Sequence, residues 1–329
     1  MKILRNTLIT ILSMVAVSVA GVGPITAQAA YPDAKPINLV IPFPAGGGVD
    51  VVGRIIAQYL ATKANANVIV ENKGGAGGTI GVGFVARAAP DGYTATMGSP
   101  GNISIAPSIY SRLPYSPSKN LQPVSMVVKM PLLLVSRVDA PFTSVKELIA
   151  YGKQHVGKLT YGSGGTGTSQ HLAGAMFAQM AHIDAVHVPY KGSAPMLIDL
   201  MAGRIDYAFI DTSAISNIKA GKLKLLAVTS AKRSELLPDT LTVAESGVPN
   251  FEAVNWYGLF MPIGVSSAVS RWLNEHVSQA LKDPAVVGKL RAQSMEPAPA
   301  MTVEEFTRFI KQDTKKWAEL VHSMNLTLN

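Results

Sequence analysis

Two matching stretches of the sequence decide the fold: Val40-Ile-Pro-Phe-Pro-Ala-Gly-Gly-Gly-Val-Asp50 and Leu159-Thr-Tyr-Gly-Ser-Gly-Gly-Thr-Gly-Thr-Ser169. Each leads from an apolar segment through glycines into a segment with helical spacing. Glycine lets the backbone turn tightly and approach a ligand closely, and the free N–H groups at the start of a helix attract anions. Ligands of open α/β sheets bind at the carboxyl ends of the strands. The repeat therefore predicts two α/β units whose glycine turns face each other across a cleft.

Either turn alone has a second interpretation, in which the glycines only shorten a strand-to-helix connection. The second stretch also carries hydroxyl groups, and this favours ligand binding over a purely structural role. These hydroxyls belong to Ser163, Thr166, Thr168 and Ser169. A third glycine run, Gly74–Gly78, precedes another predicted helix, and we interpret it as mainly structural.

Strand-like and helix-like segments alternate around these turns. The expected strands are Ile37–Ile41, Val68–Val70, Tyr93–Met97, Leu132–Ser136, Leu159–Tyr161, Ala185–Val188, Ile205–Ile210, Leu223–Thr229 and Trp256–Phe260. The expected helices are Asp50–Leu60, Thr79–Ala88, Ser169–Met180, Ala194–Met201, Ser267–Leu281, Pro284–Ala292 and Thr302–His322, with a further helix opened by the capping box Ser144–Glu147. This alternation predicts parallel sheets with helices on both faces.

The chain has 329 residues, which suggests about two domains. No Ser-, Gly- or Pro-rich linker separates them, so the boundaries must lie within ordered segments. We expect the chain to cross between the domains twice, with lobe 1 formed by 31–131 plus 256–329 and lobe 2 by 132–255. The two crossovers would act as hinges.

Residues 1–29 are typical of a secretory signal peptide. Lys2 and Arg5 precede an uncharged apolar run from Thr7 to Gly23, and Ala27-Gln28-Ala29 matches the small-x-small cleavage pattern. A membrane anchor is the alternative, but the apolar run is short for spanning and glycines follow it. Cleavage lowers the formal charge from +8 to +6. No cysteine stands at the cleavage site for lipid attachment, so we expect a soluble periplasmic protein.

Composition and motifs exclude several function classes. The 15% of charged residues form no basic block with interleaved aromatics, which argues against a nucleic-acid partner. The chain has no cysteine, hence no disulfide or thiolate metal site, and its histidines form no HExxH motif. We expect no metal and no cofactor. Gly162-Ser-Gly-Gly-Thr-Gly167 matches GxGxxG, but the next strand does not end in the acidic residue that a dinucleotide site needs.

Other side chains at strand ends are candidates for the cleft. Asp211 follows a strand and is placed either to contact a ligand or to cap the next helix. His171 is placed either to donate to a ligand or to pack. Tyr190-Lys191 forms either a cleft wall or an exposed turn, and Trp256-Tyr257 lies at the second crossover, lining the cleft or packing the hinge.

These motifs together resemble the solute-binding receptors of tripartite tricarboxylate transporters, the Bug or TctC type, from about Tyr31 to Leu326. The resemblance is carried by Tyr31-Pro32, Pro42–Asp50, Glu71–Gly78, Ala89–Tyr93, His171–Gly174, His187–Pro195 and Ala227–Arg233. It implies a type II periplasmic binding protein fold that closes on an organic anion, often a carboxylate. Departures from the family pattern are Val49 where Thr is usual, Gly74 where Pro is common, and the sequence Asp211-Thr212-Ser213.

The resemblance also implies which residues hold the ligand, one set from each lobe. The expected ligand-binding residues are Phe43, Ala45, Gly47, Gly48, Asp50, Ser99, Ser163, Gly164, Thr166, Thr168, Ser169, His171, Tyr190 and Asp211. We expect a monomeric receptor that delivers a small organic anion to membrane permease subunits and carries out no reaction. Two alternatives are a ligand sensor for a signalling partner and an exported hydrolase.

Overall fold

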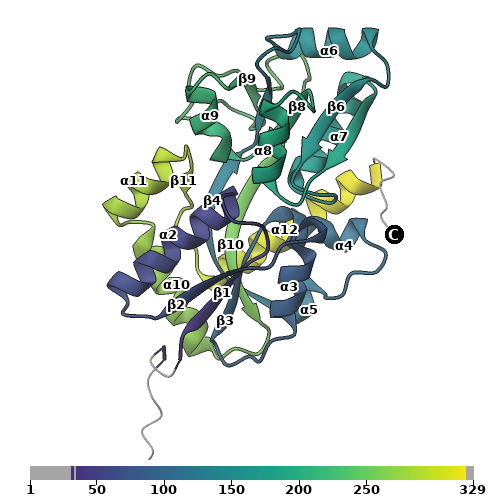
Figure 1. Ribbon diagram of the computed structural model, residues 1–329. Coiled ribbons are helices and arrows are strands. Elements are labelled where there is room, and N and C mark those ends of the chain that lie inside the picture. Colours follow the sequence, from purple (N-terminus) through teal and green to yellow (C-terminus); the bar gives the residue numbers. More distant parts are fainter. Residues whose placement is uncertain (1–30, 33–34, 324–329) are drawn as a thin grey trace, which may run out of the picture.

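Two β-sheets, each flanked by helices, form the two lobes of the protein (Figure 1). The structure is a computed structural model that describes residues 31–32 and 35–323. The predicted signal peptide and its cleavage site lie outside these residues. Among the helices of the described ranges, none combines the length and apolar character that a membrane crossing requires.

The first sheet belongs to the lobe that contains both ends of the described chain. Its strand order is β11 (Glu296–Pro297), β4 (Leu121–Pro131), β10 (Val254–Pro262), β3 (Thr94–Gly98), β1 (Ile37–Ile41) and β2 (Val68–Asn72). Its helices are α2 (Gly48–Lys63), η1 (Ala76–Gly78), α3 (Thr79–Ala86), η2 (Gly101–Ile105), α4 (Ala106–Ile109), α5 (Pro117–Asn120), α10 (Ser267–Ala280), α11 (Pro284–Ala292) and α12 (Val303–Ser323).

The second sheet builds the other lobe. Its strand order is β7 (Ala185–Pro189), β6 (Leu159–Ser163), β8 (Tyr207–Ile210), β5 (Leu133–Arg137) and β9 (Leu223–Val228). Its helices are α6 (Val145–Gln154), α7 (Ser169–Ala181), α8 (Ser193–Met201), η3 (Thr212–Ala214) and α9 (Ile215–Lys219).

The sheets are mixed, so the prediction of parallel sheets holds for only part of each sheet. β1 pairs in parallel with β2 and β3, and β6 with β7 and β8. β10 runs antiparallel to β3 and β4, and β5 antiparallel to β8 and β9. The reason is that β5 and β10 start at the connections between the lobes and run away from the cleft, whereas β1, β3, β6 and β8 run toward it.

The chain passes between the two sheets at two neighbouring segments. It enters the second sheet after Pro131 and returns to the first at Val254. Thr229, which is fully buried, ties both passages together: its hydroxyl accepts from the N–H of Leu132 at 2.7 Å, and its carbonyl accepts from the N–H of Ala253 at 2.9 Å. We propose that these passages are the hinge and that the lobes are 31–131 plus 256–329 and 132–255.

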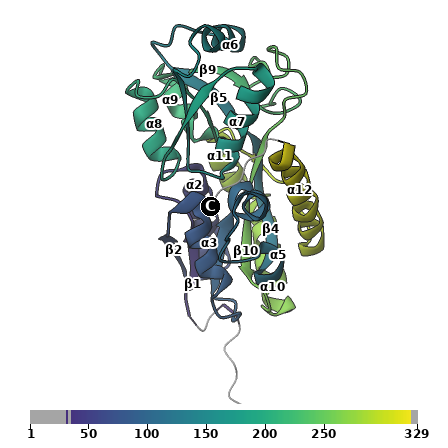
Figure 2. The same ribbon diagram turned by 90° about the vertical axis from the view of Figure 1, so that its right-hand side faces the viewer.

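Helix α12 spans both lobes (Figure 2). Near its start, Phe306 packs edge-on against Trp256 of β10, with ring centroids 6.0 Å apart. Near its end, Trp317 and Val321 belong to one buried apolar cluster with Leu172 of α7 in the other lobe and with Ile105 and Ile109 of the first. The apolar spacing along this helix predicts such a buried face. One helix therefore touches the cores of both lobes.

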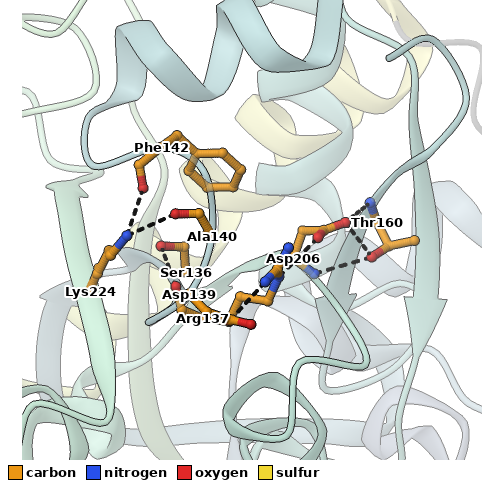
Figure 3. A network of polar contacts seen from close by, with 8 residues as sticks. All are labelled: Ser136, Arg137, Asp139, Ala140, Phe142, Thr160, Asp206 and Lys224. Carbon is orange, nitrogen blue, oxygen red and sulfur yellow. Dashed lines mark hydrogen bonds and ion pairs between the residues drawn. The ribbon is translucent and has the colours of Figure 1, made fainter.

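A polar network fixes the end of the second sheet that lies away from the cleft (Figure 3). The carboxylate of Asp206 accepts from the backbone N–H and the hydroxyl of Thr160, both at 2.9 Å, and from Nε of Arg137 at 3.2 Å. Asp206 thereby joins β5, β6 and the start of β8. Nζ of Lys224 donates to the carbonyls of Ala140 and Phe142 nearby.

Asp206→Ala is expected to lower the free energy of unfolding by about 2 kcal/mol, because it removes several charge-assisted hydrogen bonds from a largely buried site. Urea denaturation measures the loss. Asp139→Ala is the matched control, since Asp139 contacts the same arginine but is 78% exposed. Equal losses in the two variants would show that the buried network adds nothing.

Candidate functional site

The glycine turns meet in a pocket between the two lobes, at the carboxyl ends of their strands. The pocket is lined by Phe43, Gly47, Gly48, Val49, Ser99, Gly164, Thr168, Ser169, Gln170, Ser193, Asp211, Asn255 and Tyr257. None of these described lining residues is Lys, Arg or His. The volume of the pocket is about 30 Å³, room for a few waters at most. A larger ligand requires the lobes to open.

The first turn is held by Asp50, whose side chain points back into the turn. Its carboxylate accepts from the backbone N–H of Gly46 at 3.0 Å, from Nε of Arg54 at 3.0 Å and from Nδ2 of Asn72 at 2.9 Å. Burial raises the pKa of Asp50, but these hydrogen bonds outweigh it and hold the pKa below its ordinary value. Asn72 also donates to the carbonyl of Phe43 at 2.9 Å. Asp50 therefore stabilises the conformation of the turn by hydrogen bonds and does not line the pocket.

The second turn is organised by Gln170 and Thr168 at the start of α7. Oε1 of Gln170 accepts from the N–H of Gly164 at 2.6 Å, and its Nε2 donates to Oγ of Ser193 at 2.8 Å. Thr168 caps α7, accepting from the N–H of His171 at 3.3 Å and donating to the carbonyl of Gly165 at 2.7 Å. Gln170 therefore holds the start of the turn at Gly164, and Thr168 holds it at Gly165.

Two stacked histidines lie beneath the second turn. The rings of His171 and His187 are 4.0 Å apart, and Nδ1 of His171 accepts from the N–H of Gly167 at 3.2 Å. Burial lowers the pKa of His171 to about 4. Burial, together with repulsion from His171, lowers the pKa of His187 to about 3. Both rings are therefore neutral near pH 7, and His171 supports the turn from outside the pocket.

Ser163 and His187 are 2.7 Å apart, but they do not form a nucleophile and its base. The hydroxyl of Ser163 donates to the carbonyl of Gly165 at 3.0 Å, so it accepts from the imidazole. Ser163 is fully buried and does not line the pocket. The pair is a structural contact of the turn.

Asp211 caps the next helical element and also lines the pocket. Its Oδ1 accepts from the N–H of Ser213 at 3.0 Å and caps η3, while Oδ2 accepts from Oγ of Ser193 at 3.1 Å within the pocket. The side chain is 2% exposed. It also reaches across to the other lobe: a Cβ added to Gly48 would lie 2.7 Å from Oδ1 of Asp211. Burial, and then the charge of Asp211, raise the pKa of Tyr257 well above its ordinary value.

The remaining predicted residues lie beside the pocket. Thr166 and Tyr190 line a neighbouring pocket of about 210 Å³, which shares Phe43 and Gly164 with the first. Ala45 is exposed on the first turn and lines neither pocket. Burial and a hydrogen bond to Asp199 raise the pKa of Tyr190 to about 12.

The third glycine run also lies at the contact between the two lobes, which the sequence did not indicate. Gly75–Gly78 forms one wall of the neighbouring pocket, opposite the second turn. A Cβ added to Gly77 would lie 2.6 Å from the carbonyl oxygen of Thr166. The run therefore brings the two lobes into direct backbone contact.

Sequence reasoning missed several lining residues: Val49, Gln170, Ser193 and Asn255. Gln170 and Ser193 follow glycine turns at helix starts, and this position was the available signal. For Trp256-Tyr257 both alternatives hold, one for each residue. Tyr257 lines the pocket, and Trp256 packs against α12.

A family model described as "Tripartite tricarboxylate transporter family receptor" matches residues 52–326. The chain belongs to this family. It is 37% identical over 303 residues to the UPF0065 protein in the tcbD-tcbE intergenic region of Pseudomonas sp. strain P51, covering 91% of this chain and 89% of the relative. It is 33% identical over 314 residues to Protein BugT of Bordetella pertussis, covering 95% and 96%. The Bug-type resemblance is confirmed.

Solved structures of relatives share the two-lobe fold. R. palustris Rpa4515 with adipate matches with a TM-score of 0.87 and 31% identity, covering 90% of this chain and 99% of that one. MatC of Rhodopseudomonas palustris with bound malate matches with a TM-score of 0.84 and 29% identity, covering 88% and 99%. The expected periplasmic-binding-protein fold is confirmed, and the family is one of solute-binding receptors.

The histidine pair predicts how stability depends on pH. An ordinary imidazole titrates near pH 6.5, so below this pH the unfolded chain binds protons that the folded chain excludes. The free energy of unfolding should therefore fall as the pH falls from about 6.5 toward the folded pKa values near 4 and 3. Between pH 7 and pH 5 we expect a loss of about 2–4 kcal/mol.

Urea denaturation at several pH values measures this loss. The double variant His171→Asn/His187→Gln keeps hydrogen-bonding groups near both positions but does not titrate. Its stability should vary much less over the same range. An unchanged slope in the variant would contradict the assignment.

Proposed function

We propose that this protein is a periplasmic receptor that captures a small organic carboxylate between its lobes and delivers it to a tripartite tricarboxylate-type permease. It changes no bond in the ligand. The alternative of a ligand sensor shares the same binding step, because capture and closure would serve either partner. The buried pairing of Ser163 with His187 gives no support to the alternative of a hydrolase.

One observation carries the proposal: the pocket between the lobes is lined by glycine turns and polar side chains, of which only Asp211 is charged, and its carboxylate accepts hydrogen bonds from Ser193 and Ser213. Thr168, Ser169, Gln170 and Ser193 line one side, and the start of α2 at Gly48 lies on the other. Backbone N–H groups at a helix start favour an anion. Hydrogen bonds to a carboxylate are strong where water is excluded. Adipate and malate in the related structures belong to the same chemical class.

Closure and binding are linked in this proposal. The pocket at the two glycine turns leaves only about 30 Å³, and the adjoining pocket between the lobes about 210 Å³, so a dicarboxylate held at both turns needs the lobes to move apart before they close on it. A ligand that binds the closed form more tightly shifts the population toward it. The hinge at Leu132 and Ala253 is the segment where this motion would occur.

A thermal-shift screen of organic acids, including adipate and malate, tests the ligand class. A ligand present at about 100 times its Kd stabilises the native state by about 2.7 kcal/mol, which raises the Tm by several degrees. The proposal expects at least one carboxylate to do so. It fails if no organic acid raises the Tm while neutral or cationic solutes do.

Gly48→Ala tests whether the closed cleft is the binding form. The added Cβ would lie 2.7 Å from Oδ1 of Asp211 in the other lobe, so the lobes cannot approach fully, and 2.9 Å from the hydroxyl of Tyr257 in its own lobe. Calorimetric titration with an acid found in the screen should show an affinity at least about tenfold weaker, a loss of about 1.4 kcal/mol.

Gly288→Ala in α11 is the control, because its Cβ would meet nothing within 4 Å and Gly288 does not line the cleft pocket. It should bind as the unmodified protein does. Both variants should keep the circular dichroism spectrum of the parent, since alanine is favourable in a helix. Equal affinity of Gly48→Ala and Gly288→Ala would overturn the proposed closed site.

A further inference from the structure

Tyr110, the residue at which α4 ends, connects the two lobes outside both pockets of the cleft. Its hydroxyl donates to the backbone carbonyl of Thr166 in the second glycine turn at 2.9 Å. Tyr110 belongs to the first lobe and Thr166 to the second, and Tyr110 lines neither the cleft pocket nor the neighbouring one. This hydrogen bond between the lobes therefore needs no ligand.

The segment from η2 to Tyr110 packs directly on the backbone of the second turn. A Cβ added to Gly167 would lie 3.1 Å from the ring of Tyr110, and the φ of Gly167 is +79°, which also favours glycine. A Cβ added to Gly101, at the start of η2, would lie 3.0 Å from Cα of Thr168. Contact between the lobes thus extends along this segment.

An apolar cluster continues the contact on the side of α12. Its members come from η2 and α4 of the first lobe, from α7 of the second, and from the end of α12, and each is at most 3% exposed. They are Ile105, Ile109, Leu172, Trp317 and Val321, with Tyr110 packed against them. Separating α7 from α4 would expose part of this surface to water, which costs free energy.

The bond from Tyr110 also orients the turn that we propose holds the ligand. The carbonyl of Thr166 and the N–H of Gly167 belong to one peptide group, and the N–H donates to Nδ1 of His171 at 3.2 Å. The first lobe therefore holds the oxygen of this peptide group, and the second lobe holds its nitrogen. Because a peptide group is planar, the two bonds together fix its orientation.

We propose that Tyr110 is a latch and a positioning residue: it holds the cleft closed in the absence of ligand, and on closure it completes the geometry of the second turn. A ligand then binds more tightly in proportion to the closed fraction that already exists. This proposal rests on the closed cleft being the binding form, as proposed above. It does not depend on the chemistry of the ligand.

Pulsed electron paramagnetic resonance on the ligand-free protein measures the closed fraction. The chain has no cysteine, so Ala61→Cys and Ile198→Cys allow two spin labels to be attached at exposed positions of α2 and α8, one in each lobe. Opening of the cleft changes the distance between the labels. The parent should populate the closed distance without ligand.

Tyr110→Phe keeps the ring and removes the hydroxyl. The ratio of closed to open molecules should fall about fivefold, as expected for the loss of one hydrogen bond. Tyr31→Phe is the matched control, because the hydroxyl of Tyr31 donates to the carbonyl of Gly92 at 3.0 Å within the first lobe. This control should leave the ratio unchanged.

Amide hydrogen exchange measured by NMR tests the positioning role. In Tyr110→Phe the amide of Gly167 should exchange about fivefold faster. The amide of Gly164, which donates to Gln170 within the second lobe, should keep its rate. Equal changes at the two glycines would show a general loosening of the turn and would contradict the positioning role.

Tyr110→Ala removes the ring as well and should make the open form predominate, even if the parent and Tyr110→Phe are closed throughout. The latch is overturned if the ligand-free parent is entirely open, or if neither variant of Tyr110 lowers the closed fraction below that of Tyr31→Phe. No ligand is present in these measurements. A failure of every carboxylate in the thermal-shift screen would therefore count against the proposed function and not against the latch.

Discussion

Backbone segments of the two lobes approach each other so closely at the cleft that side chains would keep them apart. A Cβ on Gly48 would lie 2.7 Å from Asp211, and one on Gly77 would lie 2.6 Å from the carbonyl oxygen of Thr166. The conformation of Gly77 also has a positive φ of 63°, which favours glycine. The small volume of the cleft pocket, about 30 Å³, depends on this approach.

Because the pocket has room for only a few waters, an anion can suit it although none of its described lining residues is Lys, Arg or His. Hydrogen bonds from N–H and hydroxyl groups strengthen as the local dielectric constant falls. The groups must already be oriented, and the structure shows how: Asp50 fixes the first turn, Gln170 and the two histidines fix the second. Asp211 keeps its own charge satisfied through Ser193 and Ser213.

Local patterns in the sequence were sufficient to predict most elements and both glycine turns. The expected helix Thr302–His322 forms, and Thr302 and Glu305 cap its start with a reciprocal pair of hydrogen bonds. The direction of each strand and its neighbours in the sheet depend on tertiary structure, and local sequence patterns did not predict them. The eleven-residue strand β4 was not expected, since Pro123 interrupts it and its apolar residues do not alternate. Asn255 lines the pocket because β10 begins at the passage between the two lobes.

The central claim is that groups from both glycine turns hold one carboxylate ligand at the same time. A crystal structure with an acid found by the thermal-shift screen measures this most directly. The account predicts a carboxylate within hydrogen-bonding distance of backbone N–H or hydroxyl groups of the second turn, at Gly164–Ser169, and a ligand that also contacts the first turn at Gly47–Gly48, directly or through water. A ligand held by one lobe alone, with the cleft open, would contradict it.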